Sequence, residues 1–217
     1  MTMSLFEGVA AAGLSRESLG PGTAVLQGFA LPSDAELIAA IEDVSGRSPF
    51  RHMITPGGLR MSVAMTNCGS LGWVSDKTGY RYDAIDPENG NPWPPMPKCF
   101  LALAITAAEE AGFPEFAPDA CLINRYEPGA KLSLHQDKDE RDFGQPIVSV
   151  SLGLPAVFLF GGPARAHKTI RVPVVHGDVI VWGGPARLHY HGVMPLKTGV
   201  HSLLGEYRFN LTFRKAA

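Results

Sequence analysis

Hydrophobic residues recur at helical spacing in two segments of the first half of the chain. In residues 33–45 the apolar positions fall on one side of a helix, and Ser33 with Glu36 forms the S-x-x-E pattern of a capping box. Residues 97–111 carry a second apolar stripe, with Pro97 suited to a first helical turn and a glycine after the stripe suited to the stop. One apolar side on each segment predicts two helices that cover a sheet.

The second half of the chain changes to short runs in which apolar and polar residues alternate. From residue 119 onward Gly, Pro and Asp separate these runs, which read ACLINRYE, KLSLHQD, PIVSVSLG, AVFLFGG, TIRVPVV, DVIVWGG, ARLHYHGV and YRFNLTFR. No crossover helix fits between them, so the pattern predicts an antiparallel sandwich or barrel and a mainly β fold with flanking helices.

Residues 46–96 are rich in Gly, Pro, Asn and Asp, with short strand candidates in RMSVAMTN and GYRYD. We expect this loop-rich insert to carry function.

Composition limits the classes of protein that the sequence can encode. The chain has 217 residues, 45% of them hydrophobic, which is enough for one core, so we expect a single domain over residues 1–217. A net charge of −2 and a pI near 6.4 argue against nucleic-acid binding through overall charge and confine it to a local patch. The three cysteines lack CxxC spacing, and residues 1–15 lack the basic stretch of a signal peptide. The longest apolar run is about half of the ~20 residues that a membrane span needs, so we expect a cytoplasmic protein without membrane association.

The stretch LSLHQDKDE carries the first candidate chemistry. In a strand His135 and Asp137 point to the same face, so one element offers an imidazole nitrogen and a carboxylate oxygen to a single point. The alternative is a solvated polar face, because His-x-Asp often occurs by chance. A third ligand is available in ARLHYHGV, where His189 and His191 share a strand face and their spacing does not choose between them. Two histidines and a carboxylate leave coordination positions open and suit non-haem Fe(II).

The C-terminal stretch RFNLTFR gives an independent indication. In a strand its polar residues share one face and its apolar residues share the other; the polar set is Arg208, Asn210, Thr212 and Arg214. One interpretation is an amphipathic edge strand with a solvated polar side. The other is an inward face that binds a dicarboxylate, since arginine binds carboxylates through two hydrogen bonds and stays charged when desolvated. A dianionic cosubstrate such as 2-oxoglutarate fits the second interpretation.

Together with NRYEPGAKLSLHQDKDE, SVSLGLPAVFLFGG and HGDVIVWGG, these stretches carry a family resemblance. The chain resembles the AlkB family of Fe(II)/2-oxoglutarate-dependent dioxygenases, from SPFRHMITPGG and SVAMTNCGSLGW to the last predicted strand, and least in the first 20 residues. The resemblance implies a double-stranded β-helix, or jelly roll, as the catalytic core over about residues 119–215. It also implies an N-terminal nucleotide-recognition lid over about residues 46–96.

The resemblance assigns the metal and cosubstrate residues. It implies that His135, Asp137 and His191 hold Fe(II), which decides between the two histidines of ARLHYHGV. It implies that the pocket for 2-oxoglutarate, which is consumed with O2, is formed by Asn124, Tyr126, Arg208, Asn210 and Arg214. Phe209 stands where the family has tyrosine, but strand alternation points it away from the arginine face.

The resemblance also assigns substrate-side residues. It implies base contacts from Trp73, Tyr80, Tyr82, Asp139 and Arg165, while Lys131, His167 and Lys168 are candidate phosphate contacts. The implied activity is oxidative demethylation of 1-methyladenine and 3-methylcytosine in DNA, preferably single-stranded, with RNA as a second candidate, by a monomeric enzyme that repairs alkylation damage. Two alternatives stay open: a dioxygenase of the same fold that hydroxylates a protein or a small molecule, and a β-barrel nucleic-acid binder with a structural metal.

Overall fold

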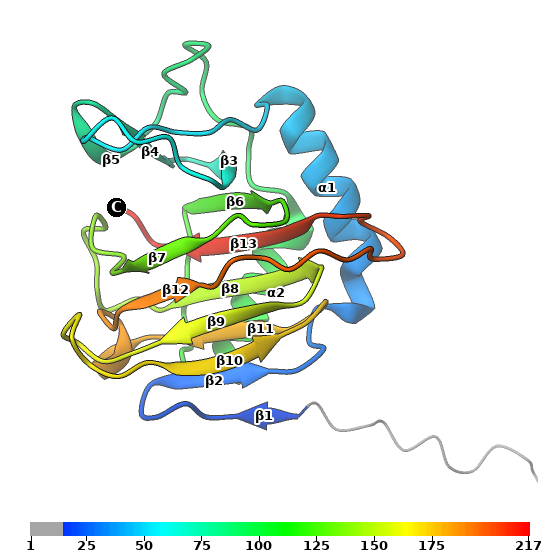
Figure 1. Cartoon of the computed structure of the whole chain (residues 1–217), viewed down its shortest axis with the longest axis vertical. Helices are drawn as coiled ribbons and strands as arrows, with labels where there is room; N and C mark the ends of the chain where they lie inside the picture. Colours follow the sequence, from blue (N-terminus) through cyan, green and yellow to red (C-terminus); the bar gives the residue numbers. More distant parts are fainter. Residues whose placement is uncertain (1–14) are drawn as a thin grey trace, which may run out of the picture.

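The computed structural model describes residues 15–217, and its framework is one large antiparallel sheet (Figure 1). The prediction that residues 1–15 are not a signal peptide concerns a segment of which only residue 15 is described. The large sheet has seven strands in the order β1 (Arg16–Glu17), β2 (Thr23–Leu26), β11 (Val179–Trp182), β8 (Ile147–Gly153), β13 (Arg208–Arg214), β6 (Ala120–Tyr126) and β3 (Ala64–Gly69).

A smaller sheet lies against the large one. It has four strands in the order β10 (Ile170–Val174), β9 (Ala156–Phe160), β12 (His191–Val193) and β7 (Leu132–His135). A separate hairpin of β4 (Gly72–Asp76) and β5 (Gly79–Asp83) stands beside the end of the sandwich near β3 (Figure 1). Every strand pair is antiparallel, so the expected jelly-roll sandwich with flanking helices is confirmed.

The large sheet separates two hydrophobic cores. On its outer side, α1 (Asp34–Arg47) and α2 (Lys98–Glu110) pack over the apolar side chains of β8, β11 and β13. The second core lies between the two sheets and includes Ile180 and Trp182 from β11 with Phe158 and Phe160 from β9. Alternation along each central strand therefore supplies both cores, since successive side chains enter opposite layers.

Both helices were predicted from sequence, but the capping box at the first was wrong. Ser33 precedes α1, yet its side chain makes no cap hydrogen bond and its hydroxyl donates to the carbonyl of Ala30 at 3.3 Å. The cause is the 3-10 turn Leu31–Ser33, which gives Ser33 a ψ of 9° rather than the extended conformation of a capping residue. No helix among residues 15–217 has the length and apolarity to cross a membrane.

Two strand expectations also change. The run ARLHYHGV contributes only His191–Val193 to a strand, because the 3-10 helix Gly184–Ala186 and the turn at residues 187–188 precede it. The edge-strand interpretation of RFNLTFR is wrong, since β13 lies between β8 and β6 and all seven of its residues are buried. The insert over residues 46–96 contributes β3 to the large sheet and the β4–β5 hairpin outside it.

The turn into β11 depends on the buried carboxylate of Asp178. One oxygen accepts a hydrogen bond from the backbone N–H of Gly28 at 2.9 Å, and the other accepts from the N–H of Val175 at 2.8 Å. The side chain therefore joins the turn before β11 to the segment between β2 and α1.

We expect Asp178→Ala to lower the free energy of unfolding by about 1–3 kcal/mol, because two partly buried backbone hydrogen bonds lose their acceptor. Urea unfolding measures the change. Asp178→Asn retains one carbonyl oxygen and should fall between Asp178→Ala and the wild type, whereas an unchanged midpoint for the alanine variant would contradict this role.

Candidate metal centre and cosubstrate pocket

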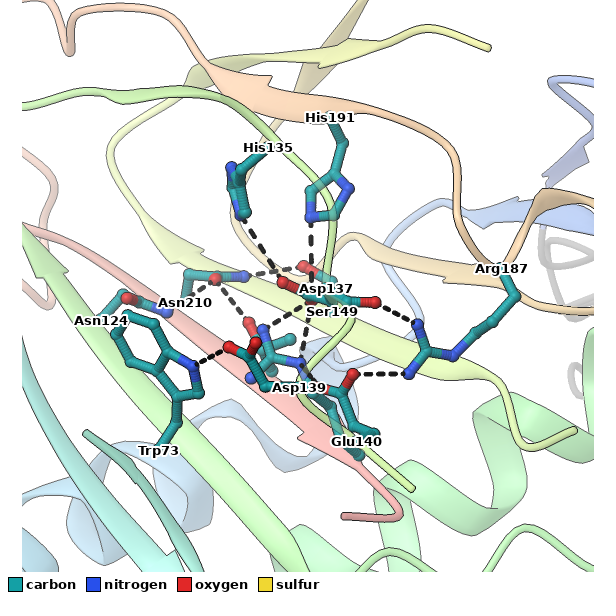
Figure 2. A network of polar contacts seen from close by, with 12 residues as sticks. Trp73, Asn124, His135, Asp137, Asp139, Glu140, Ser149, Arg187, His191 and Asn210 are labelled. Atoms are coloured by element: carbon teal, nitrogen blue, oxygen red, sulfur yellow. Dashed lines mark hydrogen bonds and ion pairs between the residues drawn. The ribbon is translucent and has the colours of Figure 1, made fainter. Parts of the chain in front are cut away.

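Three potential metal ligands meet where the small sheet ends. In the register of β12 against β7, His191 lies directly opposite His135, and the two imidazole centroids are 4.4 Å apart. Asp137 follows two residues after the end of β7, with its carboxylate oxygens 3.6 Å from Nε2 of His135 and 3.7 Å from Nε2 of His191 (Figure 2). One ligand atom from each residue lies within 4.8 Å of the others, which suits a single metal ion.

Backbone carbonyls orient both imidazoles toward that point. Nδ1 of His135 bonds the carbonyl of Ser133 at 2.8 Å, and Nδ1 of His191 bonds the carbonyl of His189 at 3.0 Å. With each Nδ1–H donating to a carbonyl, each Nε2 keeps its lone pair for a metal. His189 thus contributes its backbone oxygen, while its ring packs 5.4 Å from that of Phe160.

Electrostatics keep Asp137 ionised and His191 neutral, as metal binding requires. Burial alone would raise the pKa of Asp137, but the Arg214 guanidinium and the two imidazoles outweigh burial and hold that pKa below its usual range. Nε and Nη2 of Arg214 both donate to Oδ2 of Asp137, at 2.9 and 2.7 Å. Burial lowers the pKa of His191 to about 4, so this imidazole is neutral near pH 7.

Behind the ligands lies a cavity of about 690 Å³ whose floor is the polar face of β13. Arg208 is 2% exposed, and its Nε and Nη1 have no hydrogen-bond partner among residues 15–217. The same holds for the hydroxyl of Tyr126, directly opposite on β6, and for Oδ1 of Asn124. The Arg208 nitrogens and the Tyr126 hydroxyl are unpartnered buried donors, and they fit a carboxylate that accepts from them; Oδ1 of Asn124 is an acceptor.

The other polar atoms of the floor are already paired. Ser151 on β8 accepts a hydrogen bond from Nη2 of Arg208 at 2.9 Å, and Ser149 accepts one from Nδ2 of Asn210 at 2.8 Å. These serines are not among the residues predicted from the sequence. Their spacing in an otherwise apolar strand, IVSVSLG, was the available signal, because i and i+2 share a face.

Comparison with known proteins decides the family. Residues 22–214 match the model of the 2OG-Fe(II) oxygenase superfamily. The alpha-ketoglutarate-dependent dioxygenase AlkB of Escherichia coli is 58% identical over 93% of this chain and 93% of its own length. This chain belongs to the AlkB family. It also resembles a plant protein of Arabidopsis thaliana named DNA N(6)-methyladenine demethylase ALKBH1C, at 32% identity over 67% of this chain and 38% of the relative. The solved structure of OsALKBH1 matches 93% of this chain and all of that chain, with a TM-score of 0.81 and 29% identity.

The residues present fit the cofactors that the family uses. The chain is a 2-oxoglutarate-dependent dioxygenase, so its cofactors are Fe(II), 2-oxoglutarate and O2. His135, Asp137 and His191 are the donor set that could hold the metal, and the unpartnered nitrogens of Arg208 suit a carboxylate of the cosubstrate. When bound, Fe(II) with 2-oxoglutarate and O2 supplies the oxidising power that hydroxylates a substrate carbon.

Most of the predicted substrate-side residues gather at the mouth of this AlkB-family cavity. The rings of Trp73 and Tyr80 stack at 5.6 Å with a 13° interplanar angle, and the indole N–H of Trp73 donates to Asp139 at 2.8 Å (Figure 2). Arg165 and Lys131 also line the cavity. His167 and Lys168 are outside its lining, as is Tyr82, whose hydroxyl donates to Glu140 at 2.7 Å.

The structure adds two charged residues that sequence reasoning missed. Glu140 and Arg187 are buried, and a nitrogen of Arg187 lies 3.1 Å from a carboxylate oxygen of Glu140. A further nitrogen of Arg187 donates to the backbone carbonyl of Asp137 at 2.9 Å. Arg187 comes 47 residues after Glu140 in the sequence and has no spacing signal, so only the fold brings the pair together.

We expect alanine at His135, Asp137 or His191 to abolish turnover and to weaken Mn(II) binding more than the roughly 10- to 100-fold cost of losing an outer hydrogen bond. His189→Ala should retain activity, because the carbonyl that orients His191 remains. Metal titration followed by an assay of succinate tests this, and equal losses at His189 and His191 would contradict the ligand assignment.

We expect Arg208→Ala to weaken 2-oxoglutarate binding by about 2–5 kcal/mol, because a buried carboxylate loses its charged partner. Calorimetry with Mn(II) in place of iron measures the affinity. Arg171→Ala, at an exposed arginine on β10, is the control and should bind as the wild type does. Unchanged affinity in the Arg208 variant would place the dicarboxylate elsewhere.

Proposed function

We propose that this enzyme removes methyl groups from 1-methyladenine and 3-methylcytosine in nucleic acid and so repairs alkylation damage. The observation that carries the proposal is the stacked pair of Trp73 and Tyr80 at the mouth of the cavity that holds the metal ligands. One oxygen atom of O2 is inserted into an N-methyl C–H bond, the other enters 2-oxoglutarate as it loses CO2 and becomes succinate, and the hydroxymethyl group leaves as formaldehyde. The demethylase names of AlkB-family relatives support a nucleic-acid base as substrate.

The chain's own residues place and select the base. A base stacked in a duplex cannot reach the metal ligands, so it is taken from a single strand or flipped out at a cost of a few kcal/mol. Stacking on Trp73 offsets this cost by about 1–3 kcal/mol. The carboxylate of Asp139 faces the same mouth, and it favours the methylated bases that are cationic near neutral pH.

Strand preference follows from the same geometry. A single-stranded substrate avoids the unpairing cost, so we propose that single-stranded DNA is preferred and that RNA is accepted second. Four exposed cations along the cavity suit phosphates on either side of the flipped base; they are Arg60, Lys131, Lys138 and Arg165. We also propose that the enzyme acts as a monomer in the cytoplasm.

A succinate assay separates this function from its alternatives. Production that rises with a methylated oligonucleotide and releases formaldehyde supports base demethylation. Production that responds only to a protein or a small molecule would favour a hydroxylase of the same fold, and no production with Fe(II) and 2-oxoglutarate would favour a nucleic-acid binder with a structural metal. A panel of lesions in DNA and RNA then ranks the substrates.

We expect Asp139→Asn to lower kcat/KM for cationic lesions by about tenfold and for neutral lesions such as ethenoadenine much less, because the charge is lost while the size is kept. The amide oxygen can still accept the indole N–H of Trp73, so stacking is preserved.

Trp73→Ala is the matched variant, and it should depress both classes of lesion similarly because it removes stacking. Both variants are compared by competition between oligonucleotides at fixed salt, since phosphate contacts otherwise dominate the apparent affinity. A uniform loss in Asp139→Asn would leave this carboxylate with a positioning role only.

A further inference from the structure

One rung of the β4–β5 hairpin donates to two consecutive carboxylates beside the metal ligands. Trp73 and Tyr82 are cross-strand partners, so their side chains leave the hairpin on the same face. The indole N–H of Trp73 donates to Asp139 at 2.8 Å, and the hydroxyl of Tyr82 donates to Glu140 at 2.7 Å. Both acceptors follow Asp137 within three residues, so the hairpin is held against the segment that carries a metal ligand.

Glu140 is the buried link behind this rung. Its side chain is 2% exposed, and besides the Tyr82 hydroxyl it faces Arg187 at 3.1 Å and Arg214 at 3.4 Å. A carboxylate with this burial needs its charge compensated, and two guanidiniums supply the compensation.

The same two arginines hold Asp137 from both sides. Arg214 donates twice to the side-chain oxygen Oδ2 of Asp137, at 2.9 and 2.7 Å. Arg187 donates to the backbone carbonyl of Asp137 at 2.9 Å (Figure 2). Arg187 is itself anchored by donation from Nε to the carbonyl of Gln145 at 3.0 Å. Glu140 therefore fixes both groups that set the position of a metal ligand.

We propose that Glu140 is a positioning residue that couples docking of the β4–β5 hairpin to the orientation of Asp137, with the Tyr82 hydroxyl as the latch. The hairpin also carries Trp73 and Tyr80, so one latched rung sets the base-binding end and the metal end of the site together. This gives Tyr82 a different role from the base contact that the family resemblance implies. The inference rests on the metal assignment and does not depend on nucleic acid being the substrate.

Two substitutions break the two links separately. Tyr82→Phe removes the latch and leaves both arginines paired with Glu140, so amide hydrogen exchange in residues 72–83 should accelerate by about tenfold. Glu140→Gln keeps an oxygen to accept the Tyr82 hydroxyl but loses the charge that the arginines need. Hairpin exchange should then stay within about twofold, while Mn(II) affinity falls by about 10- to 100-fold.

Tyr80→Phe is the matched control, because it removes a hydroxyl from the same hairpin. The Tyr80 hydroxyl makes no hydrogen bond within residues 15–217, so amide exchange of the hairpin in this variant should equal that of the wild type. Unchanged exchange in Tyr82→Phe would refute the latch, and wild-type Mn(II) affinity in Glu140→Gln would refute the positioning role.

If Glu140→Gln does not fold, Glu140→Asp replaces it, since this variant keeps the charge but shortens the reach to both arginines. The same loss of Mn(II) affinity is expected, and wild-type affinity would again refute the role. Both readouts are taken without nucleic acid, so their failure is distinct from failure of the proposed substrate.

Discussion

The rest of the structure depends on the burial of β13 on both of its faces. Every residue of this strand is buried, although four of the seven are polar and two of those are arginines. Such groups are costly inside a protein unless each is paired. The neighbouring strands and the segment after β7 supply the partners, in the form of Ser149, Ser151 and Asp137. Two nitrogens of Arg208 have no partner within residues 15–217, and they suit a carboxylate of the cosubstrate.

The same pairing explains how two sites become one. Arg214 forms an ion pair with Asp137, and the guanidinium charge keeps the buried carboxylate of Asp137 ionised. The strand that forms the floor of the cavity therefore also orients the carboxylate of Asp137. His135 and His191 stand on β7 and β12 of the smaller sheet, whereas Asp137, which follows β7, is bonded to β13 of the large sheet through Arg214. The two sheets thus meet at the three candidate ligands.

The periodicity of the sequence predicted those features that depend on neighbouring residues of one segment. The alternation in RFNLTFR predicted that the polar side chains of β13 share one face and that Phe209 points away from it, and Phe209 lies in the helix-side core. It could not reveal whether the strand was central or at an edge, because strand order depends on pairings between distant segments. Parity likewise could not separate His189 from His191; the family resemblance favoured His191, and the difference lies in the turn that removes the former from β12.

Long-range charge pairs were beyond the sequence for the same reason. Glu140 stands in the acidic stretch after the His-x-Asp pair and looks like a solvated charge, yet the fold buries it against Arg187 and Arg214. The neighbouring Asp139 is exposed. Its partner is the neutral indole of Trp73, and no cationic side chain of residues 15–217 lies within ion-pair distance of it. These two consecutive acids therefore differ in role. The charge of Glu140 is neutralised by arginines inside the protein, whereas the charge of Asp139 remains at the mouth of the cavity, where a cationic base would meet it.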